Sequence, residues 1–178
     1  MRIIAGSLKG RRLVAVPGRH VRPTSDSLRE TLFNVLGSTV EGAVVLDAFA
    51  GTGAIGLEAL SRGAARVTFV EQDPRALKAI STNIARCGAE NACTIIRGDF
   101  LRTRAHGYDL IVLDPPYEMQ ALPMTLEHAT GMAAPNGRIV LEHSRRRDVP
   151  ASVSNWTRVR ELTAGDSTLS FYLRSPRD

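Results

Sequence analysis

Four consecutive residues, Asp114-Pro115-Pro116-Tyr117, could hold an exocyclic amino group of a nucleic-acid base for reaction with the methyl group of S-adenosylmethionine (SAM). They follow the apolar run 110–113, and two prolines alone would simply end such a strand. Conjugation with the ring makes this nitrogen a poor nucleophile. The Asp114 carboxylate and the Pro115 carbonyl, whose direction the stiff Pro-Pro unit fixes, could accept both N–H groups and localise the lone pair. Tyr117 could stack on the extruded base, so that catalysis would come from positioning and electrostatics.

Methylation of cytosine at C5 is a competing chemistry, and it would need a cysteine thiolate to attack the ring. The chain has two cysteines, Cys87 and Cys93, and neither follows the run 110–113. We expect Cys87 in a helix and Cys93 at the start of a strand, both as small core residues. They form no CxxC pair and have no histidine cluster beside them, so we expect no metal site.

The glycine-rich segment from Asp47 to Gly56 is the candidate cofactor loop. Gly51, Gly53 and Gly56 satisfy the pattern GxGxxG, and Glu71 follows where an acid could bind ribose hydroxyls. These features alone also fit a nicotinamide dinucleotide. Asp47 favours SAM, because a carboxylate there would bind the ammonium of the methionine moiety but would repel a pyrophosphate.

A third acid, Asp99, follows the expected strand 94–96 and could accept a hydrogen bond from the adenine amino group, with Phe100 beside the ring. Any one of these acids could be only a turn residue. Asp47, Glu71 and Asp99, however, follow three successive expected strands, and ligands bind at the carboxyl ends of such strands. The set therefore favours SAM as the cofactor and S-adenosylhomocysteine as its product.

The elements that must position these residues alternate between strands and helices. A helical stripe of apolar residues spans 28–36 and ends before Gly37, with Thr24 and Ser27 as equally good N-caps. A helix follows the glycine loop, and another runs from about Pro74 to Cys87, before Gly88. Strands are expected at 43–46, 66–70, 94–96, 108–113 and, after an Asn136-Gly137 turn, 138–141, with a terminal hairpin at 156–162 and 168–173. This order predicts an α/β fold with a mostly parallel sheet.

The first twenty residues are basic and have no acid before Asp26. Their charged side chains are Arg2, Lys9, Arg11, Arg12 and Arg19, and the whole chain has a net charge of +5. The segment could be a solvated surface or a strip that follows a phosphate backbone, and the sequence leaves both open. We predict a small arm or hairpin over residues 1–20 and one main domain over 21–178. We find no signal peptide or membrane-spanning run and expect a cytoplasmic protein.

Several motifs resemble a known family. Asp47-Ala-Phe-Ala-Gly-Thr-Gly53 with Asp114-Pro-Pro-Tyr117 resembles the amino-directed, Rossmann-like SAM-dependent methyltransferases. Arg22-Pro23-Thr24, the run Arg-Glu-Thr-Leu-Phe-Asn at 29–34 and the run Gly-Leu-Glu-Ala-Leu-Ser-Arg-Gly at 56–63 are similar to the RsmD group. The resemblance extends from Arg2 to about Glu142. It implies a Rossmann-like fold with a seven-stranded sheet that ends in a C-terminal β-hairpin.

The resemblance also implies an activity, methylation of guanine N2 in 16S ribosomal RNA, with a 30S subunit or an assembly intermediate as partner. We expect a monomer and no membrane. The implied SAM-binding residues are Arg22, Pro23, Thr24, Asp47, Phe49, Gly51, Gly53, Glu71, Asp99 and Phe100, and residues 114–117 would hold the guanine. The chain has Glu71-Gln72-Asp73-Pro74 where an acid and an arginine sometimes occur, and Tyr117 where the group often has Phe.

Two alternatives stay open at this point. The same motifs serve DNA methylation at adenine N6, although the part of the chain after the core is short for a separate target-recognition region. Methylation of cytosine is the weaker form of that alternative. A non-enzymatic SAM-binding or RNA-binding module is the second alternative, but pure binding does not need a pair of acceptors that localises an amine lone pair.

Overall fold

The computed structural model describes residues 1–16 and 26–176 and has the expected α/β class. Its α-helices are α1 (Asp26–Leu36), α2 (Ala54–Ser61), α3 (Pro74–Cys87) and α4 (Leu122–Met132). Short 3-10 helices are η1 (Gly37–Val40), η2 (Glu90–Ala92) and η3 (Phe100–Arg102). The strands are β1 (Val44–Ala48), β2 (Arg66–Glu71), β3 (Cys93–Arg97), β4 (Tyr108–Leu113), β5 (Ala133–Ser144), β6 (Ser152–Val153), β7 (Trp156–Ala164) and β8 (Ser167–Arg174).

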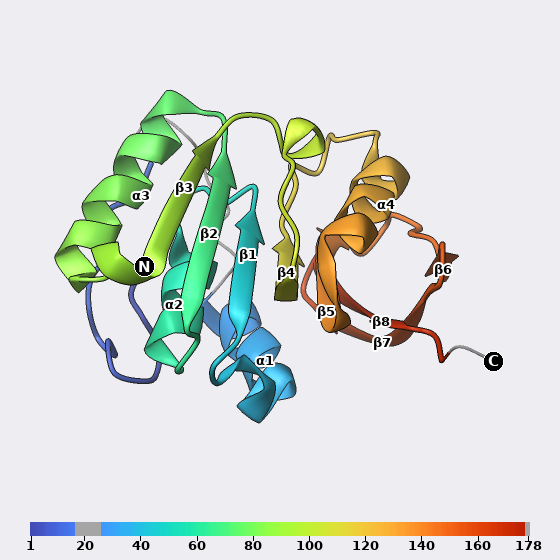
Figure 1. Cartoon of the computed structure of the whole chain (residues 1–178), viewed down its shortest axis with the longest axis horizontal. Coiled ribbons are helices and arrows are strands. Elements are labelled where there is room, and N and C mark those ends of the chain that lie inside the picture. The colour runs from blue at the N-terminus through green and yellow to red at the C-terminus, as the bar shows by residue number, and fades with distance from the viewer. Residues whose placement is uncertain (17–25, 177–178) are drawn as a thin grey trace.

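One sheet organises the molecule, with strand order β3-β2-β1-β4-β5-β8-β7-β6 (Figure 1). The first five strands in this order are parallel, as helix-length connections between them predict. The terminal hairpin β7–β8 then pairs antiparallel with β5, which confirms the predicted C-terminal hairpin. The sheet has eight strands among the described residues rather than the expected seven, because the two-residue β6 pairs with β7.

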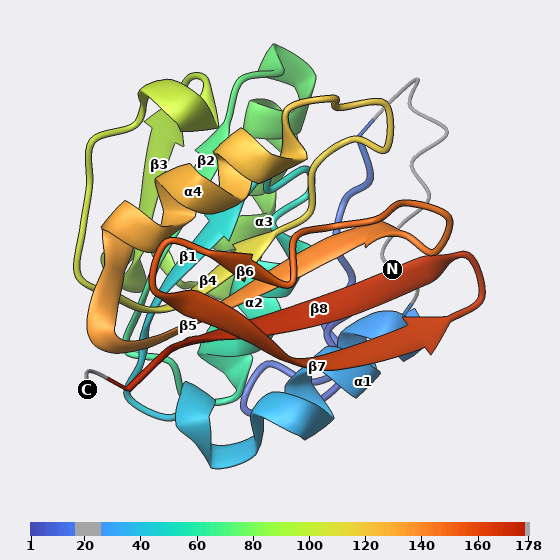
Figure 2. The same ribbon diagram turned by 90° about the vertical axis from the view of Figure 1, so that its right-hand side faces the viewer.

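Helices cover both faces of the sheet, and each face has its own apolar core. One core joins α1, α2 and α3 to the side of the sheet that carries Val45, Phe69, Val112 and Val140. The other joins α4 to the opposite side of the same strands. Figure 2 shows α4 and the β7–β8 hairpin toward the viewer, with the parallel strands β1 to β4 behind them. Strands that are covered on both faces explain the continuous apolar runs in the sequence.

Local signals set most element ends. Helix α3 begins where the Asp73 side chain accepts a hydrogen bond from Arg75 N at 2.8 Å, and it ends at Gly88, whose φ of +64° suits a left-handed C-cap. Helix α1 begins at Asp26, so the prediction of Ser27 as its N-cap is wrong. The other candidate cap, Thr24, lies outside the described residues.

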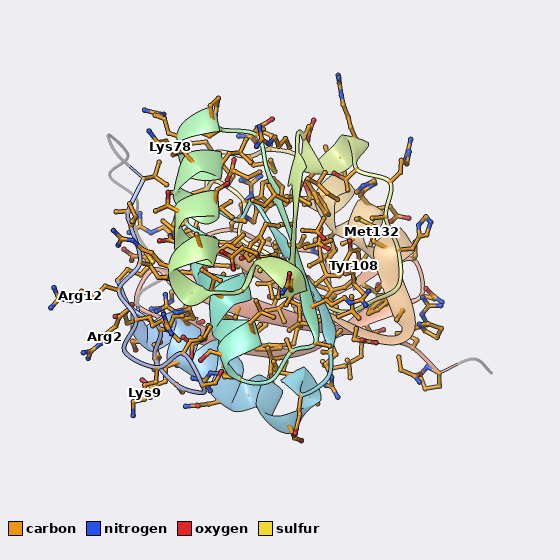
Figure 3. The ribbon with its side chains drawn as sticks, turned by 60° about the vertical axis from the view of Figure 1, so that its left-hand side comes forward. Arg2, Lys9, Arg12, Lys78, Tyr108 and Met132 are labelled. Atoms are coloured by element: carbon orange, nitrogen blue, oxygen red, sulfur yellow. The ribbon has the colours of Figure 1, made fainter. Side chains whose placement is uncertain are left out.

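The predicted Asn136-Gly137 turn falls inside β5, which begins at Ala133. The pairing between β4 and β5 is irregular there, between Tyr108 and Leu110 of β4. Figure 3 shows Tyr108 close to Met132 at the end of α4, where Gly107 N donates to Met132 O at 2.9 Å. Because Tyr108 pairs with Ala133 and Leu110 with Arg138, the four residues 134–137 of β5 lie opposite a single residue of β4. The turn signal therefore coincides with an irregularity inside the strand and not with a break before it.

The N-terminal segment packs against α2 rather than extending into solvent. Arg2 and Arg12 form an antiparallel bridge, as expected of a small hairpin, while Ile3 and Leu13 are buried in the core on that side. Gly6 makes the close approach possible, since a Cβ atom there would lie 1.7 Å from the carbonyl oxygen of Ser61. The proposed domain boundary between residues 20 and 21 lies outside the described residues.

Glu58 of α2 anchors this segment. Its two carboxylate oxygens accept from Ile4 N at 2.7 Å and Ala5 N at 3.1 Å. The fully buried Arg29 side chain of α1 lies 3.7 Å from Glu58 Oε2 and donates to Arg2 O. Glu58 therefore joins the N-terminal segment to two helices through one buried charge.

Within residues 1–16 and 26–176, no helix combines the length and the apolar character that crossing a membrane would require.

We expect Glu58→Ala to lower the free energy of unfolding by about 3–5 kcal/mol, because it removes the buried one of the two carboxylates beside the Arg29 guanidinium and leaves Ile4 N and Ala5 N without their acceptor. Urea unfolding followed by circular dichroism would measure the change. Glu30→Ala, which removes an exposed carboxylate from α1, is the matched control and should stay within about 0.5 kcal/mol of the parent. Equal stabilities of the two variants would show that the Glu58 cluster does not stabilise the fold.

Candidate active site

A pocket of about 750 Å³ lies at the carboxyl ends of the parallel strands. Its walls include most of the residues that the sequence singled out, namely Asp47, Phe49, Gly51, Glu71, Asp99, Phe100 and Asp114 to Tyr117. Gly53 does not line it, and the predicted cofactor residues Arg22, Pro23 and Thr24 lie outside the described residues. The cofactor loop and the tetrapeptide therefore face one common space.

Asp47, the residue before the last in β1, is a buried acid that lines this pocket. Its Oδ2 accepts from Gly56 N in the first turn of α2 at 2.8 Å, which couples the strand end to the helix start. Burial raises the pKa of Asp47 well above its ordinary value, and the negative charges of Asp114 and Glu71 raise it further. The hydrogen bond from Gly56 opposes this shift. A cation placed beside Asp47 would favour its charged form.

The glycine loop reverses the chain between β1 and α2. Gly51 and Gly53 have φ of +57° and +76°, values that L side chains rarely adopt. Gly53 also packs closely on Phe69, whose ring would lie 3.2 Å from an added Cβ, so Gly53 shapes the turn without lining the pocket. Phe49 has φ of +62°, and such strain in a non-glycine residue is typical of functional loops.

Glu71 ends β2 and organises the backbone at the pocket wall. Its Oε2 accepts from Gly51 N at 2.9 Å, and its Oε1 accepts from Gln72 N and Asp73 N at 2.8 and 2.9 Å. A carboxylate has about four lone-pair sites, so these bonds leave acceptor capacity for a hydroxyl. The sequence predicted Glu71 as a ligand but did not reveal that it also holds the glycine loop.

Asp99 and Phe100 follow β3 on the next part of the wall. Asp99 Oδ1 accepts from Leu101 N at 3.0 Å and starts η3. The Phe100 ring is buried and lies with its centroid 5.4 Å from that of Phe49 and 5.1 Å from that of His128. The better exposed Phe49 is therefore the aromatic side chain that offers more surface to a planar ligand here.

The tetrapeptide is held at both ends. Asp114 N donates to Ala48 O at 3.4 Å, which joins the tetrapeptide to the end of β1. The Tyr117 hydroxyl lies 2.5 Å from the Ser167 hydroxyl at the start of β8, and Arg147 Nη1 donates to Tyr117 O at 3.0 Å. Contacts from the start of β8 and from the connection after β5 thus fix the ring and the backbone of Tyr117 at the pocket mouth.

The sequence analysis missed Arg29, a pocket-lining residue whose side chain has no exposed surface. Its Nη2 donates to Asp26 Oδ1 at 3.0 Å as well as to the N-terminal segment. Its Nε and Nη1 make no hydrogen bond within the described part of the chain. A buried guanidinium with donors to spare favours an anionic group in the pocket. No spacing signal marks such a residue, because α1 and the glycine loop meet only in the folded chain.

Glu142 is the second pocket residue that sequence analysis missed. Leu113 of β4 pairs with Leu141 of β5, so the residues that follow, Asp114 and Glu142, are neighbours across the sheet. Glu142 is only 5% exposed and lines the pocket. Its carboxylate and that of Asp114 therefore belong to the same wall. Nothing in the local sequence around Glu142 indicates a role, since the signal is the register of two distant strands.

Neither cysteine lines the pocket. Burial raises the pKa of Cys87, and burial also raises the pKa of Cys93 to about 12. A thiol with so high a pKa forms almost no thiolate at neutral pH, and the thiolate is the nucleophile. The geometry therefore argues against attack by cysteine on a pyrimidine ring.

The basic residues predicted to contact nucleic acid lie on the N-terminal segment, where Arg2, Lys9, Arg11 and Arg12 are exposed and line no part of the pocket. Figure 3 shows Arg2, Lys9 and Arg12 pointing away from the domain into solvent. Arg11 instead donates from Nη1 to Arg86 O near the end of α3 at 2.7 Å. The remaining predicted contact, Arg19, lies outside the described residues.

Known proteins resemble this chain over almost its full length. A family model described as "Conserved hypothetical protein 95" matches residues 1–173. "Ribosomal RNA small subunit methyltransferase D" of Escherichia coli is 35% identical over 98% of this chain and 90% of the relative. The chain belongs to the RsmD family. "Putative rRNA methyltransferase YlbH" of Bacillus subtilis is 37% identical over 97% of this chain and 98% of the relative.

Solved structures agree with the family. The structure titled "Putative methyltransferase yhhF from Escherichia coli" superposes with a TM-score of 0.88 at 34% identity, over 99% of both chains. An RNA methyltransferase from Salinibacter ruber, solved with S-adenosyl-L-homocysteine, has a TM-score of 0.68 at 18% identity and covers 88% of this chain and 95% of its own. The Rossmann-like methyltransferase fold expected from the motifs is confirmed.

We expect Asp47→Asn to stabilise the protein increasingly as the pH rises above about 4, the ordinary pKa of an aspartate. Folding raises the pKa of Asp47, so the folded state binds this proton more tightly than the unfolded state. The contribution of Asp47 to stability is therefore present at low pH and is lost as the pH rises through its pKa in the folded state. The loss is about 1.4 kcal/mol for each pH unit between the unfolded-state pKa and the folded-state pKa. Asparagine stays neutral and can keep the bond from Gly56.

Urea unfolding of both proteins at several pH values between about 4.5 and 7.5 would test this expectation. The range lies above the ordinary pKa of an aspartate, where a raised pKa changes the stability with pH. Asp109→Asn, which removes an exposed carboxylate from β4, controls for the loss of one negative charge. A stability difference between Asp47→Asn and the parent that stays constant with pH would contradict the raised pKa.

Proposed function

We propose that this protein transfers a methyl group from SAM to the exocyclic N2 of a guanine in 16S ribosomal RNA. The observation that carries the proposal is the shared pocket, in which the acceptor pair of Asp114 and Pro115 faces the acid-lined cofactor loop. Membership of the RsmD family supports methyl transfer, and the names of the E. coli and B. subtilis relatives support ribosomal RNA as the substrate class.

The charges of the pocket fit SAM. Its methionine moiety carries an ammonium and a carboxylate, and the pocket offers the buried Asp47 carboxylate together with the Arg29 guanidinium, whose Nη1 lacks a partner within the described residues. Glu71 would bind the ribose hydroxyls, Asp99 the adenine amino group, and Phe49 the face of the adenine ring. When bound, SAM supplies an electrophilic methyl group on a sulfonium sulfur. A dinucleotide fits less well, because its pyrophosphate would lie among carboxylates.

Catalysis then falls to the tetrapeptide. Asp114 accepts one N–H of the guanine amine and the Pro115 carbonyl accepts the other, so the nitrogen lone pair points toward the methyl group. Tyr117 stacks on the extruded base, and its ring is held by Ser167 while Arg147 holds its backbone. After direct transfer, the amine proton leaves to Asp114 or to water. Every interaction in this scheme positions a group or balances a charge, and no covalent intermediate forms.

Glu142 supports guanine over adenine, the base of the DNA alternative. Guanine presents N1–H beside its N2 amine, whereas adenine presents an N1 lone pair beside N6. A second carboxylate next to Asp114 would accept from guanine N1–H and would repel the adenine N1 lone pair. The substrate RNA would lie within a 30S subunit or an assembly intermediate, which places the enzyme in the cytoplasm. The enzyme would act as a monomer.

Incubation with labelled SAM and, separately, unmethylated 30S particles, naked 16S ribosomal RNA and duplex DNA would test the proposal. We expect label in N2-methylguanosine after digestion of the RNA to nucleosides. The Asp114→Ala variant should lose this turnover by about 100-fold or more, because positioning of the reacting amine depends on that carboxylate. Its affinity for S-adenosylhomocysteine should stay within a few fold, and Asp109→Ala, at the other end of β4, should retain full activity.

Label in N6-methyladenine or 5-methylcytosine from DNA would instead overturn the substrate, and 5-methylcytosine would also remove the role of Asp114. Unchanged turnover by Asp114→Ala would remove that residue from the mechanism whatever the substrate.

We expect Glu142→Gln to weaken the choice of guanine. Once the methylated position is mapped, RNA that carries 2-aminopurine there keeps the reactive amine but lacks the N1–H. The parent enzyme should prefer guanine by at least about tenfold in kcat/KM, equivalent to one charge-assisted hydrogen bond. The side-chain amide that this substitution introduces can donate to the bare N1, so the preference should shrink in the variant. An unchanged preference would show that Glu142 does not contact the base.

A further inference from the structure

The turn that follows β5 carries three consecutive arginines, Arg145, Arg146 and Arg147. Arg147 binds the backbone of Tyr117, but the proposed reaction gives no role to Arg145 and Arg146. Arg145 and Arg146 are exposed and Arg147 is half-buried. The turn is locally ordered, because Arg147 N donates to Ser144 O at 2.9 Å and Arg146 N donates to Ser144 Oγ at 3.3 Å. Two cationic side chains are thus presented on a defined backbone.

This turn lies at the mouth of the candidate active site. Arg145 N donates to Asp166 O in the β7–β8 turn at 2.8 Å, while Arg147 reaches the backbone of Tyr117 on the other side. A second hollow of about 480 Å³ lies beside the turn, lined by Tyr117, Ser144, Arg145, Arg146 and Asp166. Tyr117 and Asp166 also line the main pocket, so the two hollows are adjacent.

The charge of the second hollow favours an anion. No carboxylate of the described residues forms an ion pair with Arg145 or Arg146. Two acids lie beside this turn. Asp148 follows it in sequence, and Asp166, which lines the same hollow, accepts a hydrogen bond from Arg145 N with its backbone oxygen. Both guanidinium groups therefore remain available to a ligand that brings its own negative charge. Arginine matches phosphate especially well, because its planar fork can donate two parallel hydrogen bonds.

We propose that Arg145 and Arg146 bind the phosphates of the RNA strand on either side of the target guanosine. The inference rests on the proposed function and adds the surface that holds the substrate. A base that is turned out into a pocket leaves its backbone at the pocket mouth, and phosphate contacts there fix its position. Arg147 links this contact to catalysis, since it joins the same turn to Tyr117, which stacks on the base. The N-terminal basic residues would contact more distant parts of the RNA.

The test uses the full chain and the RNA that the parent protein methylates, either naked 16S ribosomal RNA or 30S particles. In the double variant Arg145→Ala with Arg146→Ala, KM for RNA should rise at least about tenfold. The slope of log affinity against log salt should flatten by roughly two units, about one for each lost phosphate contact. Affinity for S-adenosylhomocysteine should stay within about twofold of the parent, because neither arginine lines the cofactor pocket.

Three further double variants make the result specific. Arg66→Ala with Arg104→Ala removes two exposed arginines that line neither hollow, and it should leave KM unchanged. Arg145→Lys with Arg146→Lys keeps both charges and should recover most of the salt slope, with less recovery of KM because lysine cannot form the fork. Lys9→Ala with Arg12→Ala measures the contribution of the N-terminal segment by the same two readouts.

Three outcomes would overturn the inference. The first is a parent-like KM and salt slope in the alanine variant, which would leave the methylation itself intact. The second is an equal change of KM and salt slope in the Arg66 and Arg104 control, which would show that only the net charge of the protein matters. The third is failure of the lysine variant to recover any salt slope, since a phosphate contact depends on charge. Absence of methylation of any RNA by the parent protein would instead refute the proposed function.

Discussion

The hydrogen bond between the buried carboxylate of Asp47 and the backbone N–H of Gly56 is the interaction around which the pocket forms. It fixes the end of β1 against the start of α2, and the glycine loop has to span the short gap between these two points. The loop can do so because Gly51 and Gly53 adopt positive φ, and Glu71 of the neighbouring strand then binds the loop backbone. One carboxylate thus gives the loop its shape, and a cation bound beside it would offset the effect of burial and favour its charged form.

A second buried charge connects this loop to the rest of the chain. Glu58 lies in the helix that the loop begins, and it holds both the N-terminal backbone and the Arg29 side chain of α1. Arg29 in turn lines the pocket close to the cofactor loop. The N-terminal segment is therefore part of the structure that supports the pocket, whichever surface of that segment RNA contacts. This arrangement explains why a short basic segment is packed so firmly onto α2.

The tetrapeptide depends on the opposite side of the sheet. Its first residue follows β4 beside β1, but Tyr117 is held by Arg147 of the β5–β6 connection and by Ser167 at the start of β8. The antiparallel strands that extend the sheet beyond β5 therefore do more than cover an edge, since they supply the contacts that orient the stacking ring. The cofactor side and the base side of the pocket come from different halves of the sheet, and they meet between β1 and β4.

Much of this molecule follows from local sequence. Each of its signals acts within a few residues. Apolar runs of strand length predict the parallel sheet, Asp73 and Gly88 mark the ends of α3, and the glycine loop marks the edge of the sheet where ligands bind. The acids at the strand ends and the tetrapeptide are local signals of the same kind. Their convergence follows from topology, since parallel strands end at one edge.

Only the tertiary structure decided the rest, because those features depend on residues far apart in the chain. The pairing of Glu142 with Asp114 comes from strand register, and the place of Arg29 in the pocket comes from the packing of α1 on α2. Tertiary pairing also decided that β5 begins before the predicted Asn136-Gly137 turn, which falls in an irregular stretch of that strand. The arginine turn at 145–147 is an ordinary basic run in the sequence, and it acquires its position at the pocket mouth only when β5 and the β7–β8 hairpin pair.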